Sequence, residues 1–282
     1  MTLLVTGSRG QLGGALLAAA AARGVPAEGH DLDTLDITDP VAVERAVLRL
    51  RPSAIVNCAA MTDVDRCESE PDAATRINGL AVGNLARAAD LAGATLVQIS
   101  TDYVFPGTGA NPWREDDPVD PVNAYGRSKA LGESLARTAR RHLVVRTAWL
   151  FGPGGRNFVE AILGRIAGGA TALDVVDDQR GCPTYAPDLA EAILDLLERN
   201  ARGVVHGVND GATTWFGFAR AIAARAAPEV EIRPVPTSAV PRPARRPANS
   251  VLATERLRAL LGRSLPPWED ALDRYLEARC AS

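Results

Sequence analysis

The chain has 282 residues, of which 46% are hydrophobic and 23% are charged, enough for one large domain with or without a smaller lobe. A formal net charge of −3 supplies no broad basic surface, so we expect no nucleic-acid partner. The most apolar stretch, residues 15–22, is too short to span a bilayer, and a strand-like run begins at Thr2, so we expect neither membrane contact nor export. The four cysteines form no C-x-x-C pair, which favours reduced thiols, no metal site and a cytoplasmic protein.

Short apolar runs alternate with helical patterns from residue 2 to about residue 210. Strands are expected at residues 3–5, 25–30, 54–56, 95–100, 143–146 and 203–208, and helices at 11–23, 40–50, 72–91, 125–140 and 188–198. This alternation is typical of a parallel sheet that is covered by helices on both faces. We therefore predict an α/β protein with a Rossmann-like, doubly wound parallel sheet.

Three glycines lie in the turn between the first predicted strand and the first predicted helix. Gly7 and Gly10 permit a tight turn and a close backbone approach to a pyrophosphate, while Gly13 permits close packing of the helix on the strand. The helix N-terminus adds free N–H groups and a positive dipole. Any strand–helix turn favours glycine, but here the strand, the spacing and the helix agree. The loop predicts a dinucleotide site that includes Gly7, Arg9, Gly10, Gln11, Leu12 and Gly13.

The nature of the dinucleotide stays open between NADPH and NADH. Asp31, Asp33 and Asp36 lie about 20 residues beyond the loop, where an acid accepts hydrogen bonds from the adenosine ribose and repels a 2′-phosphate. Arg9, however, could pair with that phosphate. Each aspartate could also be a solvated turn or cap residue.

Tyr125 and Lys129 are four residues apart at the start of a predicted helix, and so lie on one face of it. Lys129 is the single lysine among 31 basic residues. An ammonium group lowers the pKa of a nearby phenol and can also donate to a ribose diol, whereas a guanidinium is a rigid planar fork. Tyr-x-x-x-Lys alone is common on helix surfaces, but downstream of a dinucleotide loop it predicts an acid–base pair.

Thr101 follows the predicted strand 95–100, at the carboxyl end where ligands bind in open α/β sheets. Its hydroxyl can hydrogen-bond a substrate carbonyl that Tyr125 protonates. The alternative is that Thr101 merely caps the turn. Together with the loop, we predict that Thr101, Tyr125 and Lys129 are the catalytic residues.

The alternation of strand and helix patterns becomes irregular after about residue 149. Residues 152–155 (GPGG) and, further along, the proline-dense segment 234–247 interrupt it. We expect residues 1–148 and 186–208 to form the dinucleotide-binding domain. Residues 149–185 and 209–282 would then form a smaller, discontinuous C-terminal substrate lobe.

The chain resembles the extended short-chain dehydrogenase/reductase superfamily and, within it, the dTDP-4-dehydrorhamnose reductase family. The resemblance covers nearly the whole chain. The segments that carry it are residues 6–13 (TGSRGQLG), 56–62 (VNCAAMT), 100–105 (STDYVF), Tyr125 with Lys129, 146–149 (RTAW), 178–184 (DQRGCPT) and 244–250 (ARRPANS).

The resemblance implies NAD(P)H-dependent reduction of the 4-keto group of a dTDP-linked 4-keto-6-deoxysugar, which converts dTDP-4-dehydro-L-rhamnose to dTDP-L-rhamnose. Besides the glycine loop, it assigns Asp36, Ile37, Ala59, Ala60, Thr62, Tyr125 and Lys129 to the cofactor, and Thr101, Asp102, Tyr125 and Trp149 to the sugar, with Asn157 and Arg246 assigned to the substrate diphosphate. Ala15 stands where some members carry a Glu used in metal-bridged dimers, so both a monomer and a homodimer remain open.

The same residues distinguish between alternative activities. A 4,6-dehydratase would carry a pair of acids after Thr101, whereas Asp102 is followed here by Tyr103. A non-catalytic binding or regulatory subunit would not need Thr101, Tyr125 and Lys129 together. The main alternative is a reductase of another nucleotide-linked 4-keto-deoxysugar, because pocket loops decide which sugar binds.

Overall fold

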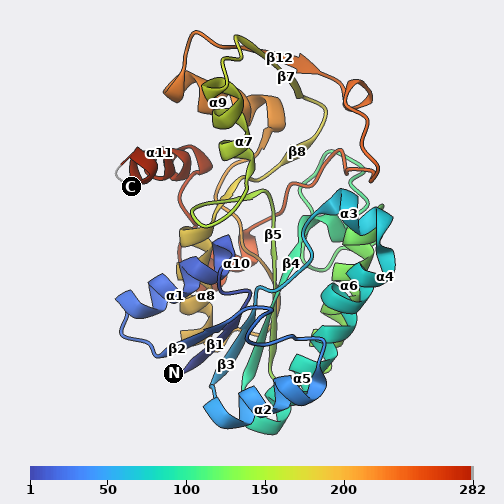
Figure 1. Ribbon diagram of the computed structural model, residues 1–282, viewed down its shortest axis with the longest axis vertical. Coiled ribbons are helices and arrows are strands. Elements are labelled where there is room, and N and C mark those ends of the chain that lie inside the picture. Colours follow the sequence, from blue (N-terminus) through green and yellow to red (C-terminus); the bar gives the residue numbers. More distant parts are fainter. Residues whose placement is uncertain (281–282) are drawn as a thin grey trace.

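A computed structural model describes residues 1–280 and has a six-stranded parallel sheet at its centre (Figure 1), which confirms the predicted fold class. The strands are β1 (Leu3–Thr6), β2 (Ala27–His30), β3 (Ala54–Asn57), β4 (Thr95–Thr101), β5 (His142–Thr147) and β10 (Gly203–His206). Their order in space is β10-β5-β4-β3-β1-β2. The chain thus moves from β1 to β2, returns past β1 to β3, and continues outward to β10.

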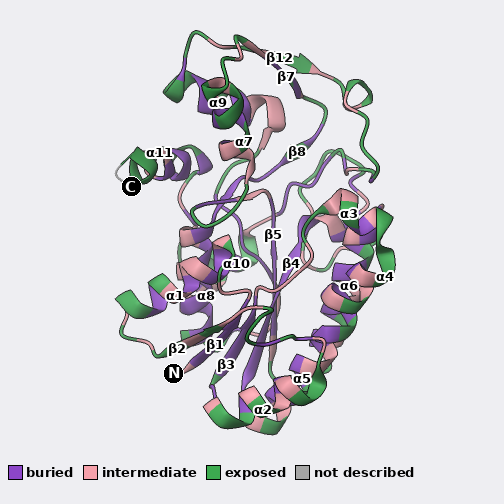
Figure 2. Ribbon diagram, viewed as in Figure 1, coloured by how far each residue is buried: buried purple, intermediate pink, exposed green. Residues whose placement is uncertain are grey.

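Helices cover both faces of the sheet. On one face lie α1 (Gln11–Ala22), α8 (Ala186–Glu198) and α10 (Glu255–Leu261), and on the other lie α2 (Pro40–Leu50), α5 (Ala81–Ala92) and α6 (Ala124–Ala136). Successive strand residues point to opposite faces, so Leu3 and Val5 pack under α1 and α8, whereas Leu4 packs under α2 and α5. The central strands β1, β3, β4 and β5 are consequently buried on both sides, as Figure 2 shows, whereas the edge strand β2 is partly exposed.

The helical region around residues 64–92 differs from the prediction. The expected helix 72–91 consists of α4 (Pro71–Ala74), a π-helical segment η1 (Thr75–Leu80) and α5, and a further short helix, α3 (Val64–Ser69), precedes it. The helix predicted to reach residue 140 ends at Ala136. Asp63 caps α3 by accepting a hydrogen bond from the backbone N–H of Arg66, 3.0 Å away, and α3 is too short and polar to show an apolar period.

A second group of elements lies beyond one end of the sheet (Figure 1). It contains β6 (Leu150–Phe151), α7 (Phe158–Ala167), β7 (Ala172–Val176), β8 (Arg180–Gly181), β9 (Thr184–Tyr185), β11 (Thr213–Thr214), α9 (Trp215–Ala226), β12 (Glu231–Val235) and α11 (Trp268–Cys280). Phe151, Phe218, Trp268 and Tyr275 are at the centre of its core. β12 pairs in parallel with β7, although we had expected proline to break the regular structure here.

The second group is connected to the sheet domain at several points. Leu257 and Leu261 of α10 belong to the core between the sheet, α1 and α8, although they lie within the segment 209–282. The Arg274 guanidinium of α11 donates to both carboxylate oxygens of Asp188 on α8, at 2.8 and 2.7 Å. The last two residues of the expected lobe, 281–282, lie outside the described residues.

Within residues 1–280 no helix is long and apolar enough to cross a membrane. In the same part of the chain no cluster of three or more His, Cys, Asp and Glu side chains could hold a metal ion.

Candidate functional site

A cavity of about 1190 Å³ lies at the carboxyl ends of β1, β3, β4 and β5. It reaches from the glycine loop to an aromatic wall in the second group of elements. The predicted residues that line it are Gly7, Gly10, Gln11, Leu12, Gly13, Asp36, Ile37, Ala59, Ala60, Thr62, Thr101, Asp102, Tyr125, Lys129 and Trp149. Arg9, Asn157 and Arg246 are not among the lining residues. The sequence thus predicted a set of residues that the fold brings to one cavity.

The glycine loop has the shape that a dinucleotide pyrophosphate requires. Gly7 has a φ of +64°, and a Cβ there would lie 2.7 Å from the backbone nitrogen of Ala59. A Cβ on Gly13 would lie 2.2 Å from the carbonyl oxygen of Gly7, so α1 approaches the loop closely. No side chain caps the N-terminus of α1, and no acid lies in its first turn, which leaves N–H groups and the helix dipole for an anion.

Beside this loop, Asp31 follows β2 directly and lines the cavity. Its carboxylate accepts hydrogen bonds from the backbone N–H groups of Arg9, at 3.1 Å, and of Leu32, at 2.9 Å. Burial opposes ionisation, but these hydrogen bonds and the Arg9 charge prevail, so the pKa of Asp31 lies below its ordinary value. A carboxylate therefore lies at the end of β2, where the fingerprint places the adenosine ribose.

Thr101 and Tyr125 reach the cavity from different elements. Thr101 ends β4, and its Oγ1 donates to Asp102 Oδ1 at 2.8 Å. Tyr125 lies in the first turn of α6, whose N-cap Asn123 accepts a hydrogen bond from the N–H of Gly126 at 2.8 Å. A Cβ on Gly126 would lie 2.1 Å from the Tyr103 carbonyl oxygen, so glycine lets the start of α6 approach the end of β4 closely.

Lys129 is buried one turn beyond Tyr125, and its Nζ donates to the carbonyl oxygen of Ile99 at 2.6 Å. Burial lowers the pKa of Lys129 to about 8, while the charge of Glu133 acts in the opposite direction. The amine therefore remains protonated at neutral pH.

Our expectation of a lowered phenol pKa at Tyr125 is wrong for this structure. Enclosure by protein raises the pKa of Tyr125 above its ordinary value, the charge of Asp102 raises it further, and the Thr101 hydroxyl only partly offsets both. The Lys129 ammonium is directed to the Ile99 carbonyl instead of the phenol. A neutral phenol is the form that can donate a proton to a reacting oxygen.

Asp102 is the most deeply buried acid that lines the cavity, with only 2% of its surface exposed. Its Oδ2 has no hydrogen-bond partner among residues 1–280. Burial raises the pKa of Asp102 to about 6, although the hydroxyl groups of Ser250 and Thr101 oppose this. A buried carboxylate oxygen without a partner suits a sugar hydroxyl as donor.

A buried ion pair supports the catalytic elements from behind. Glu133 of α6 accepts hydrogen bonds from Ser100 Oγ at 2.7 Å and from Arg146 Nε and Nη2, both at 2.8 Å. Ser100 belongs to β4 and Arg146 to β5, and both Glu133 and Arg146 are almost fully buried. The pair therefore fixes the position of α6 relative to the two strands that end at the cavity.

Two stacked tryptophans form the aromatic wall of the cavity. The rings of Trp149 and Trp215 are 3.5 Å apart between centroids and nearly parallel, at 4°. Trp149 has a φ of +46°, which is rare for a residue with a bulky side chain, and a Cβ on Gly181 would lie 2.4 Å from its ring. The sequence analysis missed Trp215, because its partner lies far away in the sequence and no local pattern marks it.

Asn157 and Arg246 make contacts within the protein. Asn157 caps α7 by accepting from the Glu160 N–H at 3.0 Å, and its Nδ2 donates to the Gly152 carbonyl at 3.0 Å. Arg246 Nη1 donates to Asp65 Oδ1 and to the Ala244 carbonyl, both at 2.6 Å. Their binding to a diphosphate stays a prediction. Arg156, which the sequence analysis did not select, does line the cavity next to the glycine-rich turn.

Asn78 is a further residue that the sequence analysis missed. It lies in η1 and exchanges two hydrogen bonds with the backbone of Met61, at 2.8 and 2.9 Å. Its Nδ2 also donates to Ser128 Oγ, at 3.0 Å, and Ser128 in turn donates to the Tyr125 carbonyl, at 2.7 Å. Asn78 thereby connects the segment that borders the cavity with the helix that carries Tyr125.

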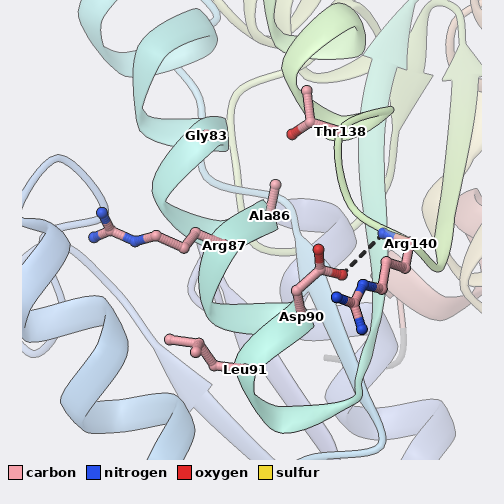
Figure 3. A pocket seen from close by; sticks show the side chains of 7 residues that line it. All are labelled: Gly83, Ala86, Arg87, Asp90, Leu91, Thr138 and Arg140. Carbon is pink, nitrogen blue, oxygen red and sulfur yellow. Dashed lines mark hydrogen bonds between the residues drawn. The ribbon is translucent and has the colours of Figure 1, made fainter.

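A second hollow of about 340 Å³ lies between α5 and the turn that follows α6. Figure 3 shows its lining residues, among which Asp90 accepts a hydrogen bond from the Arg140 backbone N–H at 2.8 Å. None of the predicted site residues lines this hollow. This hollow therefore has no part in the chemistry expected from the sequence.

The chain is similar to known proteins over nearly its whole length. The family model described as RmlD substrate binding domain matches residues 1–280. A dTDP-4-dehydrorhamnose reductase from Burkholderia thailandensis is 43% identical over 292 residues, covering 96% of this chain and 97% of that protein. The spore coat polysaccharide biosynthesis protein SpsK of Bacillus subtilis is 41% identical, covering 99% of this chain and 98% of that protein.

A crystal structure of the dTDP-4-dehydrorhamnose reductase from Bacillus anthracis, in complex with NADP, is similar to the whole chain. Its TM-score is 0.94 at 37% identity, and the match covers 99% of this chain and 100% of that chain. The chain therefore belongs to the dTDP-4-dehydrorhamnose reductase family, within the extended short-chain dehydrogenase/reductase superfamily.

Proposed function

We propose that this chain is the NAD(P)H-dependent reductase that converts the 4-keto group of dTDP-4-dehydro-L-rhamnose to the alcohol of dTDP-L-rhamnose. The observation that carries the proposal is the single cavity in which the glycine loop and the residues Thr101, Tyr125 and Lys129 meet. Membership of the family supplies the substrate class.

Bound NADPH or NADH supplies the hydride for the carbonyl carbon. The Tyr125 phenol donates its proton to the carbonyl oxygen, so that a ketone becomes a secondary alcohol. Thr101 orients this oxygen through its hydroxyl group. Lys129 contributes positive charge near the developing phenolate and binds the cofactor ribose.

For the substrate, we assign the sugar to Asp102 and Trp149 and the diphosphate to Asn157 and Arg246. The unpartnered Oδ2 of Asp102 supports the first assignment, because a sugar hydroxyl can donate to it. The Arg246 side chain is only partly buried and touches the Tyr103 phenol, which supports a place near the cavity. The hydrogen bond of Arg246 to Asp65 must adjust for a phosphate to bind.

We further propose that residues 1–148 and 186–208 bind the cofactor, and that residues 149–185 and 209–282 form the substrate lobe. The separate core around Phe151 and Phe218 supports this division, and α10 is the part of residues 209–282 that packs on the sheet instead. The four free cysteines are compatible with a protein that works in the cytoplasm, as a monomer or a homodimer.

The main alternative is a reductase of a different nucleotide-linked 4-keto-deoxysugar. SpsK, a relative of similar identity, is named for spore coat polysaccharide biosynthesis, and its name does not specify the sugar. The test is to follow oxidation of NADPH and of NADH with a panel of dTDP-linked 4-ketosugars that differ in configuration. The proposal requires the highest kcat/KM with dTDP-4-dehydro-L-rhamnose; a higher value with another sugar supports the alternative, and no turnover with any sugar contradicts both.

A further inference from the structure

A bidentate ion pair stands at the rim of the cofactor cavity. Arg9 Nη2 and Nη1 donate to the two carboxylate oxygens of Asp33, at 2.6 and 3.1 Å. Neither residue lines the cavity, whereas Asp31 and Leu32 do. The Arg9 guanidinium is thus held mainly at Asp33, just outside the space that the dinucleotide would occupy, and its Nε also lies 3.6 Å from Asp31 Oδ2.

The position of this pair relative to the adenosine ribose follows from the backbone. The Arg9 N–H donates to Asp31 Oδ2 at 3.1 Å, and Asp31 follows β2 directly. In a dinucleotide-binding fold the acid at this point faces the ribose hydroxyl groups, and a 2′-phosphate would extend from the same ribose. Arg9 is therefore the cation next to the place of the 2′-phosphate, and Asp33 occupies the donors that would bind it.

We propose that Asp33 is a competing anion that holds Arg9 away from the 2′-phosphate of NADPH and so sets the preference between NADPH and NADH. This inference rests on the proposed function only in that a dinucleotide binds at the glycine loop. Arg9 alone would favour NADPH, and Asp31 alone would favour NADH. Asp33 reduces the advantage that Arg9 gives to NADPH, which leaves the two cofactors closer in affinity.

The exposure of the pair makes this exchange feasible. The side chains of Arg9 and Asp33 are 66% and 59% exposed, so solvent screens their attraction and the pair breaks at low cost. A 2′-phosphate carries about 1.5 to 2 negative charges at pH 7 and offers three acceptor oxygens, whereas a carboxylate carries one charge and two oxygens. The phosphate therefore outcompetes Asp33, but loses part of its binding free energy in doing so.

The test measures the Kd of NADPH and of NADH by titration calorimetry without any sugar substrate. Four proteins are compared: the parent, Arg9→Ala, Asp33→Asn and the double variant. Asp33→Asn should bind NADPH about 3- to 10-fold more tightly and NADH unchanged, because Arg9 can then bind the phosphate without first breaking its exposed ion pair with Asp33. Arg9→Ala should weaken NADPH by about tenfold or more and leave NADH unchanged, because a charge-assisted bidentate contact is lost.

The double variant separates the competition from simple repulsion between Asp33 and the phosphate. If Asp33 acts by holding Arg9, then Asp33→Asn has less than about a twofold effect on NADPH when Arg9 is already alanine. If Asp33 only repels the phosphate, the gain is the same in both backgrounds, and the proposal is overturned. Arg49→Ala is the matched control, since Arg49 is an exposed arginine that pairs with Glu28 of β2 and does not line the cavity.

Each remaining outcome also decides the question. An Arg9→Ala variant that weakens both cofactors equally, or an Asp33→Asn variant with unchanged NADPH affinity, overturns the inference. Because no sugar is present, a failed reduction assay leaves these results standing and affects the proposed function alone. Failure of the parent protein to bind either dinucleotide overturns both.

Discussion

At the scale of single residues, burial changes the proton affinity of Lys129 and Tyr125, two of the residues for which we propose a catalytic role. Burial lowers the pKa of Lys129 to about 8, so its amine is still charged at neutral pH, whereas the pKa of Tyr125 is raised and its phenol keeps its proton. These shifts give a charged amine and a neutral acid one helical turn apart. The neutral phenol is the form that a reduction requires, since it can protonate the oxygen of the reduced carbonyl.

Replacing Tyr125 by Phe removes this proton while retaining the ring and its edge-on contact with Tyr103, at 5.9 Å between centroids. We expect kcat to fall by about 10²-fold or more, the usual contribution of general acid catalysis. Cofactor affinity, measured by titration, is the control and should change little. A kcat close to that of the parent would remove Tyr125 from the role of proton donor.

Asp102 makes stability depend on pH in an unusual direction. Burial raises its pKa in the folded protein from 3.8 to about 6, so the folded state binds more protons than the unfolded chain between these values, and the free energy of unfolding falls as pH rises through this window. Asp102→Asn should therefore raise the free energy of unfolding by roughly 1–3 kcal/mol at pH 8, and by little at pH 4. Denaturant titrations at both pH values measure this difference. An equal gain at the two pH values would show that ionisation is not the cause.

At the scale of elements, the sequence predicted where a helix begins better than where its regular geometry is interrupted. The helix 40–50 was predicted to the residue, because Asp39 caps it and Pro40 suits the first turn. The π-helical segment η1 was not predicted, because Asn78 is stabilised there by contacts with Met61 and Ser128, which no local pattern reveals.

The same distinction applies to the site. Residues within contiguous motifs, such as the glycine loop and the pair Tyr125 and Lys129, were found from spacing alone. Trp215 and Arg156 line the cavity because the second group of elements folds over it, and that arrangement depends on long-range packing. Sequence spacing reports on neighbours along one element, so it cannot reveal such partners.

The connection that Asn78 makes between two elements gives a further prediction. Asn78→Ala leaves the Met61 N–H without its partner, which should lower the free energy of unfolding by about 1–3 kcal/mol. It should also weaken dinucleotide binding, because the segment 58–62 borders the cavity. Unfolding and cofactor titrations measure the two effects.

Ser128→Ala serves as the comparison, since it removes one of the contacts of Asn78 and leaves those with Met61 intact. It should affect cofactor affinity much less than Asn78→Ala. If Asn78→Ala loses stability but binds the cofactor normally, Asn78 has no positioning role.

At the scale of the whole molecule, a few ion pairs connect the second group of elements with the sheet domain. Arg274 of α11 pairs with Asp188 of α8, and Asp188 also accepts from Asn209 Nδ2 at 2.7 Å. The guanidinium lies over the ring of Tyr185, 5.3 Å from its centre. The ion pair thus joins α11, in the group of elements that carries the aromatic wall, to α8, which packs beside α1 and the glycine loop.

Arg274→Ala should therefore raise the KM for the sugar nucleotide several-fold without changing the cofactor Kd. The loss of unfolding free energy should be only about 1 kcal/mol, because Arg274 is partly exposed and solvent screens the pair. Arg225→Ala is the matched control, as Arg225 pairs with Asp273 of the same helix but from α9, within the second group. Equal KM changes in the two variants would show that the connection to α8 has no special effect on the substrate.

The order of the strands has a consequence for how the chain folds during synthesis. The edge strand β10 pairs with β5, yet the chain between them supplies much of the second group of elements. Until α8 is complete, Leu3, Val5, Val56 and Val97 lack the cover of Leu189, Ile193 and Leu196 on one face of the sheet. A nascent chain that stops near residue 148 thus exposes an apolar sheet face and an unpaired strand edge, both of which promote aggregation. The N-terminal half is accordingly expected to depend on chaperones until about residue 200 has left the ribosome, and fragments cut between the two halves should aggregate rather than fold.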